Sequence, residues 1–195
     1  MLCDGTRCQA TIWLFINGET LMRLPLIVFI CCNLCACLGA PEGVVPVKNF
    51  DVDRYLGVWY EVARLDHSFE RGLDAVSAEY SMRDDGGLRV VNSGRSAATG
   101  GREQAVGRAY FVEAEDTGYL KVSFFGPFFG SYIIFHLDRK NYQYAFVAGN
   151  TTDYLWLLSR TPEVSEQVMQ DFLEQSATLG FDTEALIFVD HGDKG

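Results

Sequence analysis

Hydrophobic and polar residues alternate in short runs along most of the chain, and turn-forming residues separate these runs. Alternation with a period of two is typical of β-strands that have one buried face. Clusters of Gly, Pro, Asp and Asn mark the breaks, and Asp84-Asp85-Gly86-Gly87 is a strong hairpin turn. The pattern predicts eight strands, at residues 57–66, 75–83, 88–94, 104–113, 118–125, 130–138, 142–149 and 153–160.

After the eighth predicted strand the hydrophobic period becomes that of a helix. Thr161-Pro162 and Ser165 are both suitable residues for its beginning. The apolar residues that follow recur at three- and four-residue spacing, so they form one face that we expect to pack on the outside of the sheet. Gly180 fits the position just after the helix, and a last short strand is expected at 185–189.

The order of these elements predicts the fold class. Parallel strands need long crossover connections, and no helix separates the eight strands, so the strands must be antiparallel. An all-β, eight-stranded up-and-down barrel leaves no exposed edge, and the helix would then lie outside it. A barrel of this size can hold one small ligand. A β-sandwich is the structural alternative.

The start of the chain is typical of an export signal. Arg23 precedes a short apolar run, residues 24–30, and we expect translation to begin at Met22 rather than Met1. Pro and Gly in the following stretch predict an extended tether. The chain is thus divided into an export signal, a tether and a barrel domain, at residues 1–37, 38–46 and 47–191.

The signal ends in Leu34-Cys35-Ala36-Cys37, which resembles a bacterial lipobox. The resemblance implies acylation of Cys37, and Leu38 in place of Asp implies delivery to the outer membrane. An ordinary Cys-rich signal peptide is one alternative. A retained membrane-spanning helix is another, although three residues interrupt the apolar run that it would need, namely Arg23, Pro25 and Asn33.

Charge and cysteine usage restrict the function classes. The 16 Lys and Arg residues against 26 Asp and Glu give a net charge of −10, which disfavours nucleic acid as a partner. All six Cys residues lie in the first 37 positions, so the barrel has no disulfide and no Cys nucleophile. The three His residues have no metal-ligand spacing, and no Gly-x-Ser-x-Gly motif occurs. We therefore expect no enzyme activity, metal or cofactor.

Two motifs in the barrel domain resemble a known family. Gly57-Val58-Trp59 lies near the start of the domain, and Thr152-Asp153-Tyr154 with Arg160 lies near its end. Their order and spacing are similar to the signatures of the lipocalins, and the stretches 66–73 and 121–130 resemble the bacterial outer-membrane branch. The resemblance implies that Arg160 lies across the Trp59 indole at the closed end of the barrel. The signature residues would then build the fold: Gly57, Trp59, Thr152, Asp153, Tyr154 and Arg160.

The candidate ligand-binding residues come from strand alternation and from the resemblance. Counting back from Arg160, alternation places Leu158, Trp156 and Tyr154 on the inward face, and each could equally be core packing. The resemblance adds Tyr80, Asn92, Phe124 and Tyr132. Alternation from Tyr132 places Ile134 and His136 on the same face. Cations at strand ends are candidates for the rim of the pocket: Arg64, Arg89 and Arg95.

These observations predict a lipid-anchored lipocalin on the periplasmic face of the outer membrane. The resemblance implies fatty acids or lysophospholipids as ligands, stored or transported in envelope maintenance, and a homodimer. Burial of an acyl chain would drive binding, at about 0.8 kcal/mol per CH₂. One alternative is an interaction protein with a filled barrel. Another is a tetrapyrrole binder that uses His136 as an axial ligand.

Overall fold

The computed structural model describes residues 38–192. The predicted export signal, its start at Met22 and the lipidation site Cys37 lie outside the described residues. Within residues 38–192, no helix is long and apolar enough to cross a membrane.

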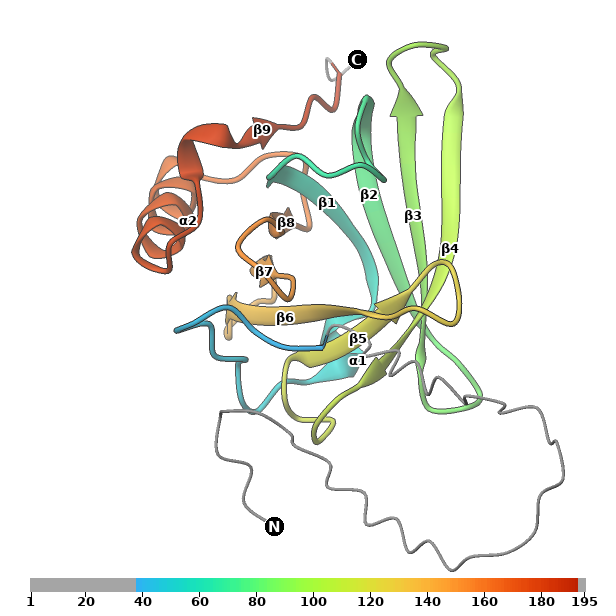
Figure 1. The fold of residues 1–195 in the computed structure, drawn as a ribbon, viewed down its shortest axis with the longest axis vertical. Coiled ribbons are helices and arrows are strands. Elements are labelled where there is room, and N and C mark those ends of the chain that lie inside the picture. Colours follow the sequence, from blue (N-terminus) through green and yellow to red (C-terminus); the bar gives the residue numbers. More distant parts are fainter. Residues whose placement is uncertain (1–37, 193–195) are drawn as a thin grey trace, which may run out of the picture. The chain divides into compact units, whose positions relative to one another are not determined.

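The chain forms one antiparallel sheet that closes into a barrel (Figure 1). Each strand from β2 to β7 pairs with the next one in the chain, and β1 closes the ring by pairing with both β2 and β8. This closure confirms the predicted barrel and rules out the sandwich. The strands are β1 Gly57–Arg64, β2 Leu73–Met82, β3 Leu88–Ser96, β4 Arg102–Phe111, β5 Tyr119–Ser123, β6 Gly130–Leu137, β7 Tyr144–Ala148, β8 Leu155–Ser159 and β9 Ile187–Phe188.

Strand β1 is shared between its neighbours along its length. Its first half, to Tyr60, pairs with β2, whereas Ala63 and Arg64 at its far end pair with β9. Strand β9 therefore takes the place beside β1 that β2 leaves as it bends away. It is shorter than the strand predicted at 185–189, because Thr183–Ala185 form a 3₁₀ turn (η1).

Two α-helices flank the barrel. The short α1, Val52–Tyr55, was not predicted, and Asp51 caps it by accepting hydrogen bonds from two of its backbone N–H groups. Helix α2 spans Glu166–Thr178, and the Ser165 side chain accepts from the Val168 N–H. Ser165 is therefore the N-cap, and Thr161-Pro162 precedes the helix. Gly180 follows the helix with φ +84°, a conformation that favours glycine, as predicted.

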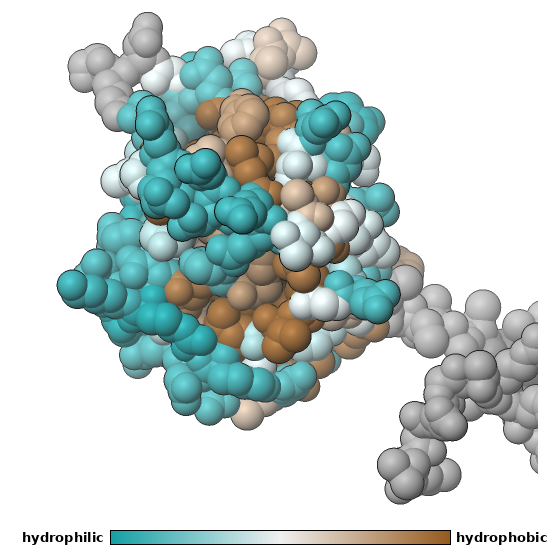
Figure 2. All heavy atoms as spheres, turned by 90° about the vertical axis from the view of Figure 1, so that its left-hand side faces the viewer, coloured by the Kyte–Doolittle hydropathy of each residue, from teal (hydrophilic) through white to brown (hydrophobic). Residues whose placement is uncertain are grey.

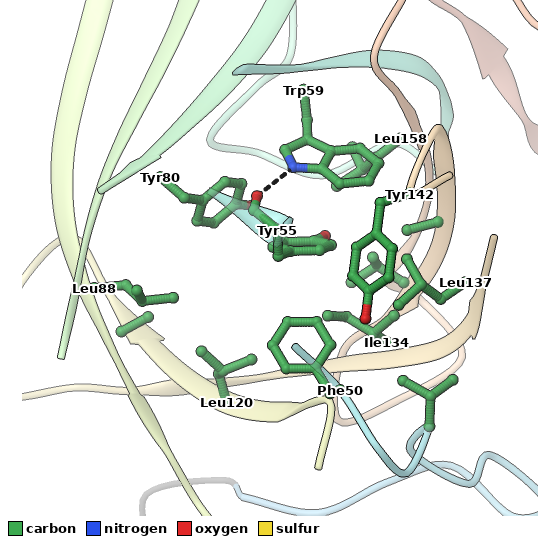
Figure 3. Packing of buried hydrophobic residues seen from close by; sticks show 14 of the residues in the cluster. Phe50, Tyr55, Trp59, Tyr80, Leu88, Leu120, Ile134, Leu137, Tyr142 and Leu158 are labelled. Atoms are coloured by element: carbon green, nitrogen blue, oxygen red, sulfur yellow. Dashed lines mark hydrogen bonds between the residues drawn. The ribbon is translucent and has the colours of Figure 1, made fainter. Parts of the chain in front are cut away.

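Hydrophobic residues pack on both sides of the sheet. One cluster fills the closed end of the barrel interior, where the side chains in Figure 3 point toward one another. A second lies between the outer face and α2, where Phe146 and Phe172 meet edge to face at 5.0 Å. Figure 2 views the side that carries α2 and shows hydrophilic residues over most of it, with hydrophobic surface gathered in its middle. All strands of the barrel, both hydrophobic clusters and helix α2 lie within residues 38–192.

One contact closes the narrow end of the barrel. The Arg160 guanidinium lies over the Trp59 ring, 3.9 Å from the ring centroid. It donates to the Val58 and Arg54 carbonyls, both at 2.8 Å. The Trp59 indole in turn donates to the Tyr55 carbonyl at 2.8 Å (Figure 3). The predicted stacking is confirmed. Two of the carbonyls that Arg160 holds belong to the α1–β1 segment, and the Tyr142 carbonyl accepts from its Nε at 3.3 Å.

Replacing Arg160 by Ala should destabilise the barrel by about 2–4 kcal/mol, because the cation–π contact and three charge-assisted hydrogen bonds are lost together. Urea unfolding followed by circular dichroism measures this change. Arg102→Ala is the matched control, since Arg102 is exposed on β4, and it should stay within about 0.5 kcal/mol of wild type. Equal midpoints for both variants would show that the contact does not hold the closed end.

Candidate ligand-binding cavity

Above the closed end the barrel is hollow. The cavity has a volume of about 560 Å³, and its walls are mostly apolar and aromatic side chains from the inward faces of the strands. Six of the seven predicted ligand-binding residues line it: Tyr80, Asn92, Phe124, Tyr132, Trp156 and Leu158. Tyr154 also lies in the wall, nearer the mouth. The structure therefore places around one space the residues predicted from alternation (Tyr154, Trp156 and Leu158) and those predicted from the resemblance (Tyr80, Asn92, Phe124 and Tyr132).

The alternation argument is wrong at the middle of β6. Ile134 points inward as expected, but it belongs to the core at the closed end and not to the cavity wall. The register shifts between Ile134 and His136, as at a β-bulge, so His136 turns to the outside. There its ring stacks on Phe146 and lies 3.1 Å from the Gln175 side chain of α2. The tetrapyrrole alternative thus loses the axial ligand on which it depended.

Three tyrosine hydroxyls form a polar floor beneath the cavity. Tyr80 donates to Tyr132 at 2.9 Å, and the Tyr55 and Tyr132 hydroxyls lie 2.7 Å apart. Burial is the main cause that raises the pKa of all three phenols above the ordinary value. They therefore remain protonated, and the floor is polar but uncharged.

A cluster of charged side chains lies at the mouth, where the β1–β2 connection folds over the barrel. Arg64 is 2 % exposed and donates to the Glu61 carboxylate at 2.8 Å and to the Glu70 carbonyl at 3.0 Å. The Glu70 carboxylate accepts from Asn92 and Trp156, both at 3.3 Å, and lies 3.0 Å from His67. These contacts fix the connection to β3 and β8.

The two glutamates of this cluster differ in protonation. Burial, followed by the neighbouring Glu70 charge, raises the pKa of Glu61 well above its usual range despite the contact with Arg64. Burial also acts on Glu70, but the neighbouring His67, Glu61 and Trp156 side chains together outweigh it, so the pKa of Glu70 is lowered. Glu61 therefore holds its proton to a higher pH than Glu70 does.

The cavity wall carries no cation. Three of the wall residues are carboxylic acids, namely Glu61, Glu70 and Glu103. None of the wall residues in the described part of the chain is Lys or Arg. None of the three candidate rim cations is a wall residue. Arg64 is buried against Glu61, while Arg89 and Arg95 are exposed and lie outside the wall. A negatively charged ligand group therefore finds no cation among the wall residues.

The motif Thr152-Asp153-Tyr154 lies in the turn between β7 and β8. Thr152 and Asp153 are exposed there, and the Asp153 carboxylate accepts from the Thr151 hydroxyl at 3.0 Å. Gly149 precedes the turn, and a Cβ at that position would lie 2.6 Å from Tyr154 Cβ. The turn thus needs a glycine where the chain passes close to Tyr154.

Several wall residues were missed by the sequence analysis. Glu61 follows Trp59 by two positions on β1, so alternation from the tryptophan would have placed it inside. Glu70 comes from a connection, where alternation gives no signal. Within residues 38–192, no group of three or more His, Cys, Asp and Glu side chains is arranged to hold a metal.

The raised pKa of Glu61 predicts a pH-dependent stability. Between the unfolded pKa of about 4.3 and the raised folded pKa, the folded protein binds more protons, so the free energy of unfolding falls as pH rises. Glu61→Gln does not titrate, so its free energy of unfolding should not share this fall, and its stability relative to wild type should increase as pH rises from 5 to 8. Urea unfolding at a series of pH values tests this.

Glu79→Gln serves as the control, because Glu79 is exposed on β2, and it should follow wild type at each pH. Parallel pH curves for Glu61→Gln and wild type would contradict the raised pKa of Glu61.

Comparison with known proteins places this geometry in a family. Residues 50–191 match the model of the lipocalin-like domain. The outer membrane lipoprotein Blc of Vibrio cholerae is 56 % identical over 168 residues, which cover 86 % of this chain and 98 % of that protein. Blc of Escherichia coli K12 is 52 % identical, covering 80 % and 87 %. Mouse apolipoprotein D is 31 % identical, covering 75 % and 79 %.

The fold also matches solved structures. Insecticyanin from the tobacco hornworm superposes with a TM-score of 0.63, at 23 % identity, over 80 % of this chain and 88 % of that one. At this identity the match concerns the fold alone. Together with the family match and the identity to Blc and apolipoprotein D, it leads to one conclusion. The chain belongs to the lipocalin family.

Proposed function

We propose that this protein is an outer-membrane lipoprotein that binds fatty acids or lysophospholipids in the barrel cavity and stores or transports them. The observation that carries the proposal is the space of about 560 Å³ inside a closed barrel, with largely apolar walls. Cavities of this size and lining are typical of sites for small hydrophobic ligands. The Blc relatives are named as outer membrane lipoproteins, which supports the same location for this chain.

The wall favours an acyl chain as the buried part of the ligand. Val76, Ala78, Val90 and Val122 contribute aliphatic surface, and Phe124 and Trp156 contribute aromatic faces. Each CH₂ that leaves water for this surface stabilises the complex by about 0.8 kcal/mol. The tyrosine floor lies deeper and offers hydroxyl groups to the end of a chain that reaches it.

The head group belongs at the mouth. Because the wall residues include glutamates and no Lys or Arg, a carboxylate or phosphate buried in the cavity would lose its hydration without gaining a cationic partner. The anionic group of a fatty acid or lysophospholipid must therefore stay in contact with water. Only the hydrocarbon part of the ligand then contributes burial energy.

The location rests on the segment that precedes the barrel. Acylation at Cys37 would hold the protein to the periplasmic face of the outer membrane. Several acyl chains on one residue give stable anchoring, whereas one chain alone gives marginal binding. We also retain the homodimer as part of the proposal.

The filled-barrel alternative predicts no internal space. The cavity argues against it, since the side chains of the large residues at the closed end stop short of the mouth.

Filling the cavity should abolish lipid binding. Ala105 lies in the wall on β4, and Ala105→Trp would place an indole in the space of an acyl chain. Exclusion of about two methylenes already lowers affinity roughly tenfold. Displacement of a fluorescent fatty acid by palmitate and by lysophosphatidylethanolamine measures the change.

The neighbouring Val106→Trp is the matched control, because Val106 is 56 % exposed and faces outward on the same strand. Its affinity should stay within about twofold of wild type, since no wall contact changes. Equal affinities for both Trp variants would show that ligands bind elsewhere.

Native mass spectrometry of residues 38–195, purified without detergent, should show a bound lipid at near-equal stoichiometry. Lipid extraction from the same sample identifies it as a fatty acid or a lysophospholipid. The spectrum also reports whether the chain is a dimer. A mass without ligand that takes up no added lipid would contradict the binding function.

A further inference from the structure

The mouth of the cavity is surrounded by exposed phenylalanines. Phe125 is 76 % exposed, Phe128 is 65 % exposed and Phe69 is 51 % exposed, and all three also line the cavity. We call these three residues the aromatic rim. Phe125 and Phe128 lie in the β5–β6 connection, and Phe69 lies in the β1–β2 connection. Large apolar side chains gathered in this way mark an interaction surface rather than scattered surface residues.

Two cations lie directly behind the rim on the outer wall. Arg108 pairs with Ser123 on β5, and Lys121 pairs with Ser131 on β6, so both sit beside the ends of the β5–β6 connection. Their charged groups lie 5.6 Å and 5.3 Å from the centroid of the Phe129 ring. Among the described residues, neither cation forms an ion pair. Both charges are thus available to an external anion.

The described chain begins at the same place. The Gly39 N–H donates to the Ser131 hydroxyl at 3.0 Å, and the Tyr119 hydroxyl lies 3.5 Å from the Gly39 carbonyl oxygen. Ser131 follows the β5–β6 connection by one residue. Cys37 precedes Gly39 by two residues, which span at most about 7 Å. An acyl anchor on Cys37 would therefore hold the bilayer within a short distance of the aromatic rim.

We propose that the aromatic rim docks on the surface of a phospholipid bilayer. Phe125 and Phe128 enter the headgroup region, and Arg108 and Lys121 contact lipid phosphates. Apolar tips with cations behind them suit this boundary, where rings bury against acyl chains while positive charges meet phosphate. The cavity then opens against the membrane, so a lipid could pass between them without crossing water.

A second copy of the chain fits the rim less well. In a twofold dimer the same patch meets itself, so the cations of both copies would be brought together. The protein carries a net charge of −10, which opposes approach to an anionic membrane. Local cations at the rim are therefore needed for docking in that orientation, and they are found there. The docking extends the proposed function but depends on the outside of the rim and not on the cavity.

Vesicle flotation of residues 38–195 tests the docking without the anchor, since this part contains the whole barrel and core. The vesicles are phosphatidylethanolamine with phosphatidylglycerol at three to one, or phosphatidylcholine alone. Wild type should float with the anionic vesicles, and Phe125→Ser with Phe128→Ser should lower the partition about tenfold. Arg108→Glu with Lys121→Glu should lower it on the anionic vesicles only.

Phe188→Ser is the matched control, because Phe188 is 59 % exposed on β9 and lies outside the cavity wall. Its partition should stay within about twofold of wild type. Circular dichroism confirms that each variant is folded. Ala105→Trp should float like wild type although it no longer binds lipid in the cavity. Failure of the docking proposal can therefore be distinguished from failure of the proposed function.

Three results would overturn the docking proposal. The first is wild-type protein that floats with neither vesicle, and the second is a double Phe variant that floats as well as wild type. The third is a dimer that the double Phe variant converts to monomer in analytical ultracentrifugation while neither protein floats. That result would assign the rim to contact between copies.

Discussion

The guanidinium of Arg160 joins the end of the last barrel strand to the segment that enters the first. It covers the Trp59 ring and holds the Arg54 and Val58 carbonyls at the same time. Because Trp59 is thereby fixed inward, alternation along β1 is fixed as well, and with it the inward position of Glu61. The same contact packs Trp59 against Tyr55, whose hydroxyl belongs to the polar floor. The closed end therefore determines the depth and the lower surface of the cavity.

The sequence was sufficient for those parts of the fold that depend on local periodicity. Each predicted strand overlaps an observed one. Helix α2 begins after its N-cap Ser165, and Gly180 follows its end with a positive φ. The failures arise where local pattern carries no information. A register shift in β6 turns His136 outward, and α1 has only four residues, too few for a helical period. Glu70 reaches Trp156 across 86 residues of chain, a contact that no local pattern encodes.

The barrel interior combines a packed half and a hollow half. Aromatic contacts and buried aliphatic residues stabilise the closed end, whereas the mouth holds ionisable groups whose burial is unfavourable. Mutual contacts among Glu61, Arg64, His67 and Glu70 offset part of this cost and position the β1–β2 connection over the opening. Hydrophobic packing thus stabilises the closed end, whereas polar contacts hold the mouth.

The pairing of β1 with β8 also governs when the molecule can form. Tyr60 pairs with Ser159, so the ring of strands joins residues that are almost a whole domain apart in the chain. Contacts of such long sequence separation make folding slow, because the connecting chain must lose its freedom before the pairing stabilises anything. While the polypeptide is being synthesised, the first strand has no partner on one side until the eighth has appeared. Barrel closure therefore cannot begin before the eighth strand, near the end of the chain, has been made, and the first strand keeps an unpaired edge throughout most of synthesis.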